Sequence, residues 1–160
     1  MAGRFLPLGE LTPIVAAEKA RGRRVVLCNG LFDLIHVGHV RYLAAARRCG
    51  DLLVVAVNDD VAAARLKGPS RPYMPLGERA EVLCALACVD YVTAFGGDTV
   101  GEVLRALLPH VHAKGTDYTP DSLPARELDR ALGIEIAIVG DPKDHSTTDL
   151  AGRVRSAAGA

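Results

Sequence analysis

The chain has 160 residues, 49% of them hydrophobic, and a formal net charge of +0. A chain of this length supports one domain with a substantial core, so we expect residues 1–160 to form a single domain. The balanced charge does not favour a nucleic-acid partner, and no apolar run reaches membrane-spanning length, which argues against a membrane partner. Neither a signal-peptide pattern nor a paired cysteine spacing is evident, so we expect a cytoplasmic protein with reduced thiols.

Strand and helix patterns alternate along the chain. Short apolar runs bounded by turn residues predict five strands, over residues 24–28, 52–57, 89–93, 111–114 and 134–139. Helical patterns cover residues 12–22, 40–50, 61–66, 76–87, 99–108, 125–132 and the chain from 146 onward. Thr12-Pro13 has the residue types of a helix start, and Thr99 with Glu102 matches a capping box. The alternation predicts an α/β fold, a single Rossmann-like, doubly wound domain with a five-stranded parallel sheet flanked by helices.

The turn after the first predicted strand has the residue types of an anion-binding site. Gly30 lets the backbone come close to a ligand, and His36 and His39 stand around Gly38 at the start of the next helix. The amide N–H groups and the positive dipole end of a helix attract phosphate oxygens. The glycine signatures of P-loop and dinucleotide-binding proteins are absent from the sequence, so we expect the chemistry to depend on this histidine turn.

The segment His36-x-Gly38-His39 resembles the HxGH motif of the nucleotidyltransferase superfamily, also described as cytidylyltransferase-like. Members of this superfamily join a nucleoside triphosphate to a phosphorylated acceptor and release pyrophosphate. Further segments fall where the family places its motifs: Asn29-Gly30-x-Phe32-Asp33, Leu66-Lys67-Gly68-x-Ser70-Arg71-Pro72, Glu78-Arg79, Lys114-Gly115-x-Asp117-Tyr118 and Ser146-Thr147-Thr148. The resemblance therefore extends over almost the whole chain.

A narrower resemblance rests on the LKGxSRP, KGxDY and STT segments. They are similar to those of the D-glycero-D-manno-heptose 1-phosphate adenylyltransferase domain of ADP-heptose synthase. This similarity implies condensation of ATP with a sugar 1-phosphate, above all a heptose 1-phosphate, to give an ADP-sugar and pyrophosphate. Glycerol-3-phosphate cytidylyltransferase is a more distant relative that carries an arginine five positions before the serine of the last motif, where this chain has Asp141.

Two alternatives stay open. One is a cytidylyltransferase for glycerol 3-phosphate or an alditol phosphate, and the other, of a different class, is a non-catalytic nucleotide-binding module. The implied partners are small-molecule substrates, ATP and a sugar 1-phosphate, and we also expect a homodimer. The implied cofactors are ATP as substrate and Mg²⁺. The metal would be held mainly by phosphate and water, with Asp33 or Asp60 acting indirectly, so no direct protein ligands are expected.

The resemblance and the chemistry of phosphate suggest three groups of site residues. The expected catalytic residues supply N–H donors and a mobile cation to the phosphates, and they are His36, His39 and Lys67. The expected nucleotide-binding residues are Asn29, Gly30, Leu31, Phe32, Gly38, Lys114, Gly115, Asp117, Ser146, Thr147 and Thr148. The expected substrate-binding residues are Asp33, Asp60, Arg71, Arg79 and Tyr118.

Plain structural roles remain open for several of these residues. The Ser146-Thr147-Thr148 segment could simply cap a helix, and Lys67 and Arg71 could be solvated loop cations. Arg79 could pair with Glu78 or Glu81 on a helix surface.

Overall fold

The computed structural model describes residues 3–142 and 147–158. Within these residues one parallel sheet has six strands: β1 (Arg4–Phe5), β2 (Val25–Gly30), β3 (Leu52–Asn58), β4 (Tyr91–Phe95), β5 (Val111–Lys114) and β6 (Glu135–Ile138). The strand order is β1-β4-β3-β2-β5-β6, and every neighbouring pair is parallel. The predicted α/β class with a parallel sheet and flanking helices is confirmed.

The predicted number of strands is wrong by one, because β1 has only two residues. Both of them are exposed at the edge of the sheet beside β4. Backbone bonds hold the segment in place, from the N–H of Arg4 to the carbonyl of Asp90 and from the N–H of Leu6 to that of Val92. Two exposed residues have no apolar alternation, so sequence patterns cannot reveal such a strand.

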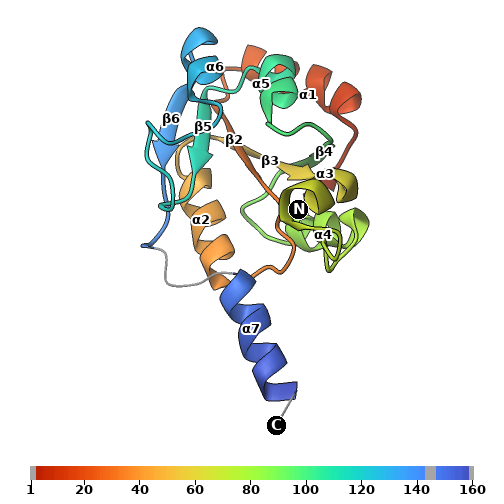
Figure 1. Cartoon of the computed structure of the whole chain (residues 1–160). Helices are drawn as coiled ribbons and strands as arrows, with labels where there is room; N and C mark the ends of the chain where they lie inside the picture. Colours follow the sequence, from red (N-terminus) through yellow and green to blue (C-terminus); the bar gives the residue numbers. More distant parts are fainter. Residues whose placement is uncertain (1–2, 143–146, 159–160) are drawn as a thin grey trace.

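Helices cover both faces of the sheet (Figure 1). They are α1 (Leu8–Ala20), α2 (Val37–Arg47), α3 (Asp60–Lys67), α4 (Leu76–Cys84), α5 (Gly101–Leu107), α6 (Arg126–Ala131) and α7 (Thr147–Ala158). In Figure 1, α7 extends away from the body of the molecule. None of the helices in the described part of the chain is long and apolar enough to cross a membrane.

Two helix starts differ from the predicted ones. Helix α1 begins at Leu8, and the Thr12 hydroxyl donates to the carbonyl of Leu8 from inside the helix instead of capping it. Helix α5 has Val100 at its N-cap with no side-chain bond, so the predicted capping box is not formed. Burial explains both shifts, because each helix begins where its apolar residues pack on the sheet, and packing outweighs a cap of about 1 kcal/mol.

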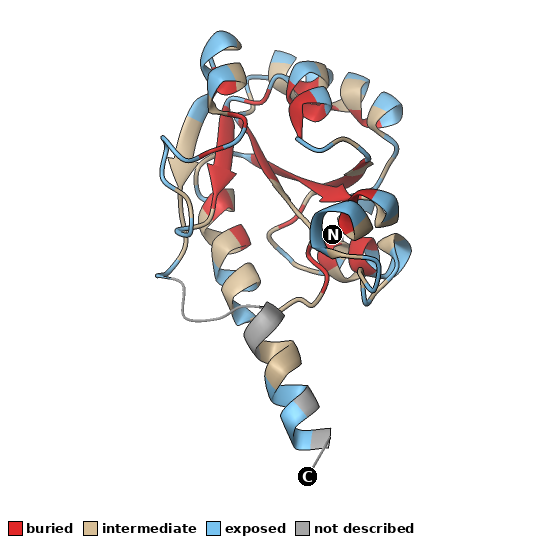
Figure 2. Cartoon of the chain, viewed as in Figure 1, coloured by how far each residue is buried: buried red, intermediate tan, exposed pale blue. Residues whose placement is uncertain are grey.

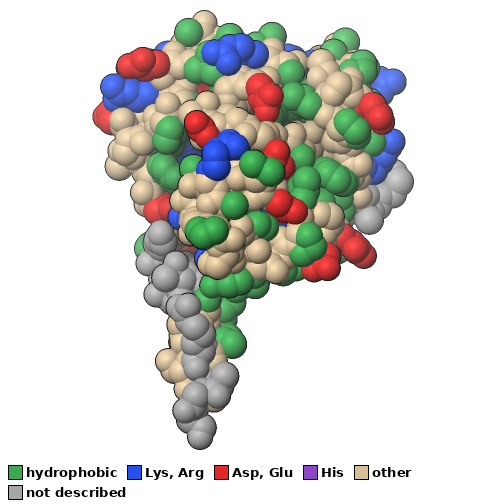
Figure 3. Space-filling view, turned by 45° about the vertical axis from the view of Figure 1, so that its right-hand side comes forward, with side chains coloured by type: hydrophobic (Ala, Val, Ile, Leu, Met, Phe, Trp, Pro, Cys, Tyr) green, Lys and Arg blue, Asp and Glu red, His purple; other side chains and the backbone are tan. Residues whose placement is uncertain are grey.

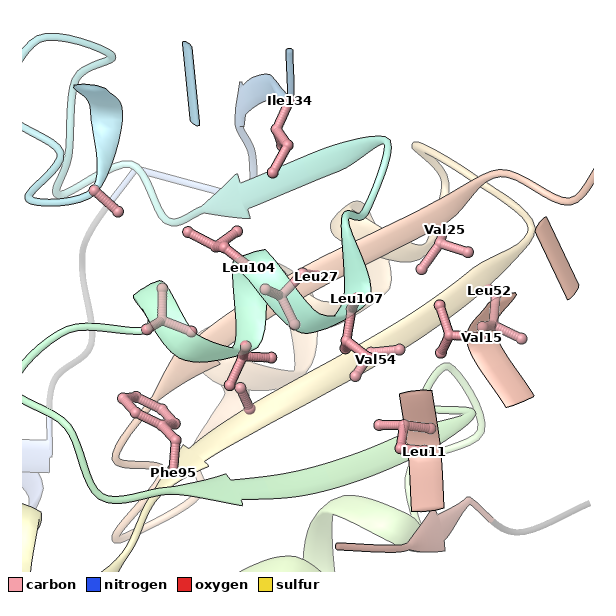
Figure 4. Packing of buried hydrophobic residues seen from close by; sticks show 14 residues of the cluster. Leu11, Val15, Val25, Leu27, Leu52, Val54, Phe95, Leu104, Leu107 and Ile134 are labelled. Carbon is pink, nitrogen blue, oxygen red and sulfur yellow. The ribbon is translucent and has the colours of Figure 1, made fainter. Parts of the chain in front are cut away.

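Alternate residues of the central strands pack into two separate apolar layers, one on each face of the sheet. Val25 and Leu27 of β2 pack with helices α1, α5 and α6 on one face, in the cluster that Figure 4 shows. Val26 and Cys28 pack on the other face with α2 and α4. All seven residues of β3 are buried, and Figure 2 shows the central strands buried under more exposed helices. This pattern is typical of a parallel sheet covered on both sides.

The connections change direction at β2. The chain moves from β2 to β3 and then to β4, but its next strand, β5, lies on the opposite side of β2. In open parallel sheets the crevice beyond the carboxyl ends of the strands at such a switch point is where ligands bind. Here those ends are Gly30 of β2 and Lys114 of β5.

Candidate active site

A cavity of about 540 Å³ opens beyond the carboxyl ends of β2 and β5. Most of the residues predicted for the site line it: Asn29, Gly30, Leu31, Phe32, Asp33, His36, Gly38, His39, Lys67, Arg71, Lys114, Gly115, Asp117 and Tyr118. Thus the fold brings together segments that are more than eighty residues apart in the sequence. A cavity of this size suits a small ligand.

The histidine turn forms one wall of the cavity. Phe32 adopts a positive φ of 51°, which is unusual for a bulky residue, and its buried ring lies 5.3 Å from the His39 ring. The His36 and His39 rings stack at a centroid distance of 4.0 Å. His36 occupies the N-cap of α2 without a side-chain cap bond, so the N–H groups of the first helical turn are not capped by this side chain.

Electrostatics favour neutral histidine at this turn. Burial and, to a smaller extent, the neighbouring His36 lower the pKa of His39 to about 4, against an opposing effect of Asp117. The buried Nδ1 of His39 has no hydrogen-bond partner among the described residues. A neutral imidazole offers one N–H donor and one acceptor. Together with the α2 N-terminus, this turn can bind an anion without a permanent side-chain charge.

Hydrogen bonds to Asp33 hold the loop between α3 and α4 against the histidine turn. Its buried carboxylate accepts from Arg71 Nε at 2.6 Å and from the backbone N–H groups of Tyr73 and Met74 at 2.8 and 3.1 Å. Arg71 also lies over the Tyr73 ring, 4.2 Å from its centroid. Asp33 was expected to bind substrate or to hold a metal indirectly, but its carboxylate oxygens are engaged by this loop, which favours a structural role.

Arg79, predicted to contact substrate, is buried beneath the same turn, and the structure does not bring it to the cavity. Its side chain is 0% exposed and lies outside the cavity lining. The guanidinium donates to the backbone carbonyls of Leu31, Asn58 and Met74 and to Asp60 Oδ1. Asp60 also lies outside the cavity, and the predicted pairing of Arg79 with a glutamate of its own helix is not seen either. Arg79 therefore joins three segments of backbone instead of facing a ligand.

Lys114 lies at the floor of the cavity with only 8% of its surface exposed. Its ammonium donates to the Asn29 backbone carbonyl at 3.3 Å and to Asn29 Oδ1 at 3.1 Å, and it lies 4.7 Å from the centre of the Tyr118 ring. Burial lowers the pKa of Lys114, while Cys28, Asp117 and Asp129 act in the opposite direction. At Gly115 a Cβ would come within 2.9 Å of Asp117 Oδ1, so a larger residue there would require the Asp117 side chain to move.

Part of the last predicted motif cannot be placed. Ser146 lies outside the described residues, and α7 begins at Thr147. The side chains of Thr147 and Thr148 are outside the described part as well. Their predicted contacts with nucleotide therefore stay predictions.

The carboxylates proposed for Mg²⁺ do not fit a metal site. Asp33 is bound by its loop and Asp60 by Arg79, and Asp60 does not reach the cavity. Among the described residues no three histidine, cysteine, aspartate or glutamate side chains are grouped so that they could hold a metal ion.

The cavity also contains residues that the sequence does not single out. Arg41 of α2 forms an ion pair with Asp141 across the rim, at 3.1 Å, and both line the cavity. Thr116 donates to the Asp141 backbone carbonyl at 2.6 Å. These contacts depend on how α2 packs against the turns after β5 and β6, which the sequence does not reveal. The only sequence signal was the position of Asp141, five residues before Ser146 of the last motif.

Comparison with known proteins gives a consistent result. A profile described as cytidylyltransferase-like matches residues 27–151. The chain is 49% identical over 144 residues to "Bifunctional protein HldE" of Pelobacter propionicus, and 50% identical over 146 residues to the protein of that name from Gluconacetobacter diazotrophicus. These matches cover 90% and 91% of this chain but only 30% of each relative, so the chain spans about a third of their length.

A solved structure is also similar. The crystal structure of the lipopolysaccharide core biosynthesis protein from Thermoplasma volcanium matches with a TM-score of 0.64 and 26% sequence identity. The match covers 76% of this chain and 100% of that chain. The similarity therefore extends over most of the sheet and helices described above.

Proposed function

Because this chain belongs to the cytidylyltransferase-like family, we propose that it is a nucleotidyltransferase that joins ATP to a sugar 1-phosphate and releases pyrophosphate. The observation that carries the proposal is the stacked His36 and His39 pair at the N-terminus of α2, which lines the cavity. This arrangement can accept phosphate without any protein nucleophile. The LKGxSRP, KGxDY and STT segments favour a heptose 1-phosphate as the acceptor.

The reaction needs positioning more than acid–base chemistry. The acceptor phosphate is already ionised at neutral pH, so one of its oxygens can attack the α-phosphorus of ATP directly. The bond from the α-phosphorus to the bridging oxygen then breaks, and its electron pair leaves with pyrophosphate. The N–H donors of the histidine turn stabilise the charge on the phosphate oxygens as this bond breaks. No proton has to move for the charges to balance.

Two cations complete the proposed site. Lys67, at the end of α3, is exposed and lines the cavity, so its ammonium can reach the triphosphate. Arg71 also lines the cavity, and within the described residues only its Nε is bonded to Asp33. Its two terminal nitrogens are therefore available to bind a phosphate, with the orientation of the guanidinium set by Asp33.

The relatives support the choice of substrate. Two proteins named "Bifunctional protein HldE" match nearly the whole of this chain, and the solved structure is titled as a lipopolysaccharide core biosynthesis protein. Mg²⁺ is proposed as the counter-ion of ATP, bound to its phosphates and to water. A homodimer is also proposed, and light scattering of the purified protein would measure its mass in solution.

The test is pyrophosphate release by the purified protein with Mg²⁺, across four nucleoside triphosphates and a panel of acceptors. The panel holds both anomers of heptose 1-phosphate, glycerol 3-phosphate and an alditol phosphate. We expect release with ATP and one heptose anomer. Release with CTP and glycerol 3-phosphate or the alditol phosphate would overturn the substrate assignment, and nucleotide binding without release would favour a non-catalytic module.

A further inference from the structure

A buried polar network begins at the floor of the cavity, where His112 is one of the lining residues, and reaches Asp129, which the proposed mechanism does not use. His112 of β5 and Asp129 of α6 are 1% and 0% exposed. His112 Nδ1 lies 2.9 and 3.1 Å from the two carboxylate oxygens of Asp129. His112 Nε2 lies 3.0 Å from Oδ1 of Asn29, the residue that also contacts Lys114. The network therefore connects α6, β5 and β2 directly under the candidate site.

The donors around Asn29 determine which way its amide faces. The Lys114 ammonium can only donate, so the Asn29 atom 3.1 Å from it must be the amide oxygen. His112 Nε2 therefore also donates to that oxygen. The other ring nitrogen, Nδ1, faces the Asp129 carboxylate, so the ring is held from both sides.

This arrangement turns the other end of the amide toward the ligand space. Asn29 lines the cavity, and within the described residues its NH₂ group donates to no protein atom. An amide whose oxygen is held by two donors cannot flip without losing both bonds. Its two N–H groups are thus held ready for an acceptor in the cavity.

We propose that His112 and Asp129 are positioning residues that fix the Asn29 amide, so that its NH₂ group donates to an oxygen of the bound nucleoside triphosphate. This inference rests on the proposed function and assigns a role to two buried residues that the proposed mechanism does not use. Asp129 holds His112, and His112 in turn holds the Asn29 amide. Asp129 also helps to keep the buried Lys114 charged beside the same amide, since it acts against the effect of burial on that pKa.

Two matched double variants separate positioning from simple stability. His112→Leu with Asp129→Val removes the ion pair and the donor to Asn29 together. His112→Gln with Asp129→Asn also removes the ion pair, but the glutamine NH₂ can still donate to Asn29 and the two new amides can bond each other. Replacing both members of a buried pair by neutral groups avoids the uncompensated charge that a single substitution would leave. His110→Leu, in the exposed turn before β5, is the histidine control.

The measurements are the melting temperature and the ATP dissociation constant by calorimetry. We expect the apolar pair to bind ATP about tenfold or more weakly than the parent, and the polar pair to stay within about threefold of it. The control should bind like the parent. Parent-like affinity of a folded apolar pair, or equal weakening by both pairs, overturns the proposal.

A second measurement uses the parent alone, in case the apolar pair does not fold. The side-chain amide resonances of Asn29 are assigned by their loss in Asn29→Asp and followed during titration with ATP. We expect them to shift on binding, and unshifted resonances at saturation overturn the proposal. Both experiments measure ATP binding and not turnover. A parent protein that binds ATP but releases no pyrophosphate would therefore overturn the proposed reaction, and the role of His112 and Asp129 could still be tested. Release of pyrophosphate with unchanged affinities overturns the network alone.

Discussion

The polar residues around the β2–α2 turn fall into two groups with opposite surroundings. His36 and His39 line the cavity at the N-terminus of α2, where the His36 side chain makes no cap bond, and the buried Nδ1 of His39 has no hydrogen-bond partner among the described residues. Asp33 and Arg79 belong to the same motif set, but their charges are matched by several protein donors or acceptors each. Groups with unmet bonding capacity can bind a ligand, whereas satisfied groups hold the shape of the site.

The surface offers no such contrast. Figure 3 shows Lys and Arg side chains interspersed with Asp and Glu side chains over the described residues of this face. Exposed pairs such as Arg65 with Asp98 are worth little in water. The distinctions that matter therefore lie around the cavity and in the buried residues next to it.

The largest expected effect is on turnover, from substitutions of His36 and His39 in the cavity. His36→Ala or His39→Ala should lower turnover by about 10²–10⁴-fold with a much smaller change in ATP affinity, because their donors matter most in the transition state. Steady-state kinetics and ATP calorimetry measure the two quantities. His110→Ala is the matched control, since its ring accepts from the Val25 N–H away from the cavity. Normal turnover in both variants would contradict the proposed mechanism.

Substitutions of the buried residues Asp33 and Arg79 should mainly lower the stability of the fold. Arg79→Ala leaves Asp60 and three backbone carbonyls without their donor, so we expect a loss of about 3–5 kcal/mol in the free energy of unfolding. Urea denaturation measures it. Arg48→Ala, at the exposed C-cap position of α2, should change stability by less than about 0.5 kcal/mol. A stable Arg79→Ala protein with weakened substrate binding would instead support the predicted contact of Arg79 with substrate.

Asp33→Asn tests whether the buried Asp33 carboxylate holds the cavity-lining residue Arg71 and its loop in place. The asparagine can still accept from the backbone N–H groups of Tyr73 and Met74, but it loses the charge opposite Arg71, at a cost of about 2 kcal/mol. The loop after Lys67 should loosen, so limited trypsin digestion should cut after Lys67 faster than in the parent. Asp121→Asn, whose carboxylate is exposed beside Arg126, is the control. An unchanged cleavage rate would show that the loop does not depend on this charge.

The smallest effect is a pH dependence in the ligand-free protein. The pKa of His39 is about 4 in the folded state, against an ordinary value of 6.5, so the unfolded chain takes up the proton first as pH falls. Stability at pH 7 is untouched by this group, and it declines through the window from 6.5 to about 4. His39→Gln should remove about 1 kcal/mol of the decline between pH 7 and pH 5.5. Identical pH profiles of parent and variant would contradict the low pKa.

Local patterns in the sequence determine the α/β class, the extent of β5 and the position of the histidine turn. Each depends on neighbouring residues, such as the apolar run before Gly30 and the helix that starts after His36. The family resemblance drawn from these motifs is confirmed by the comparisons. The Asn29, Lys67 and Lys114 segments also converge on one cavity, as the switch-point rule predicts.

Only the tertiary structure decided which charged residues face the ligand. Asp33 meets Arg71 across 38 positions, and His112 meets Asn29 across 83. A motif shows that such residues belong near a site, but it does not show whether their bonds are already satisfied by other parts of the chain. That depends on contacts between distant segments, which also added β1 to the sheet and placed Arg79 beneath the site.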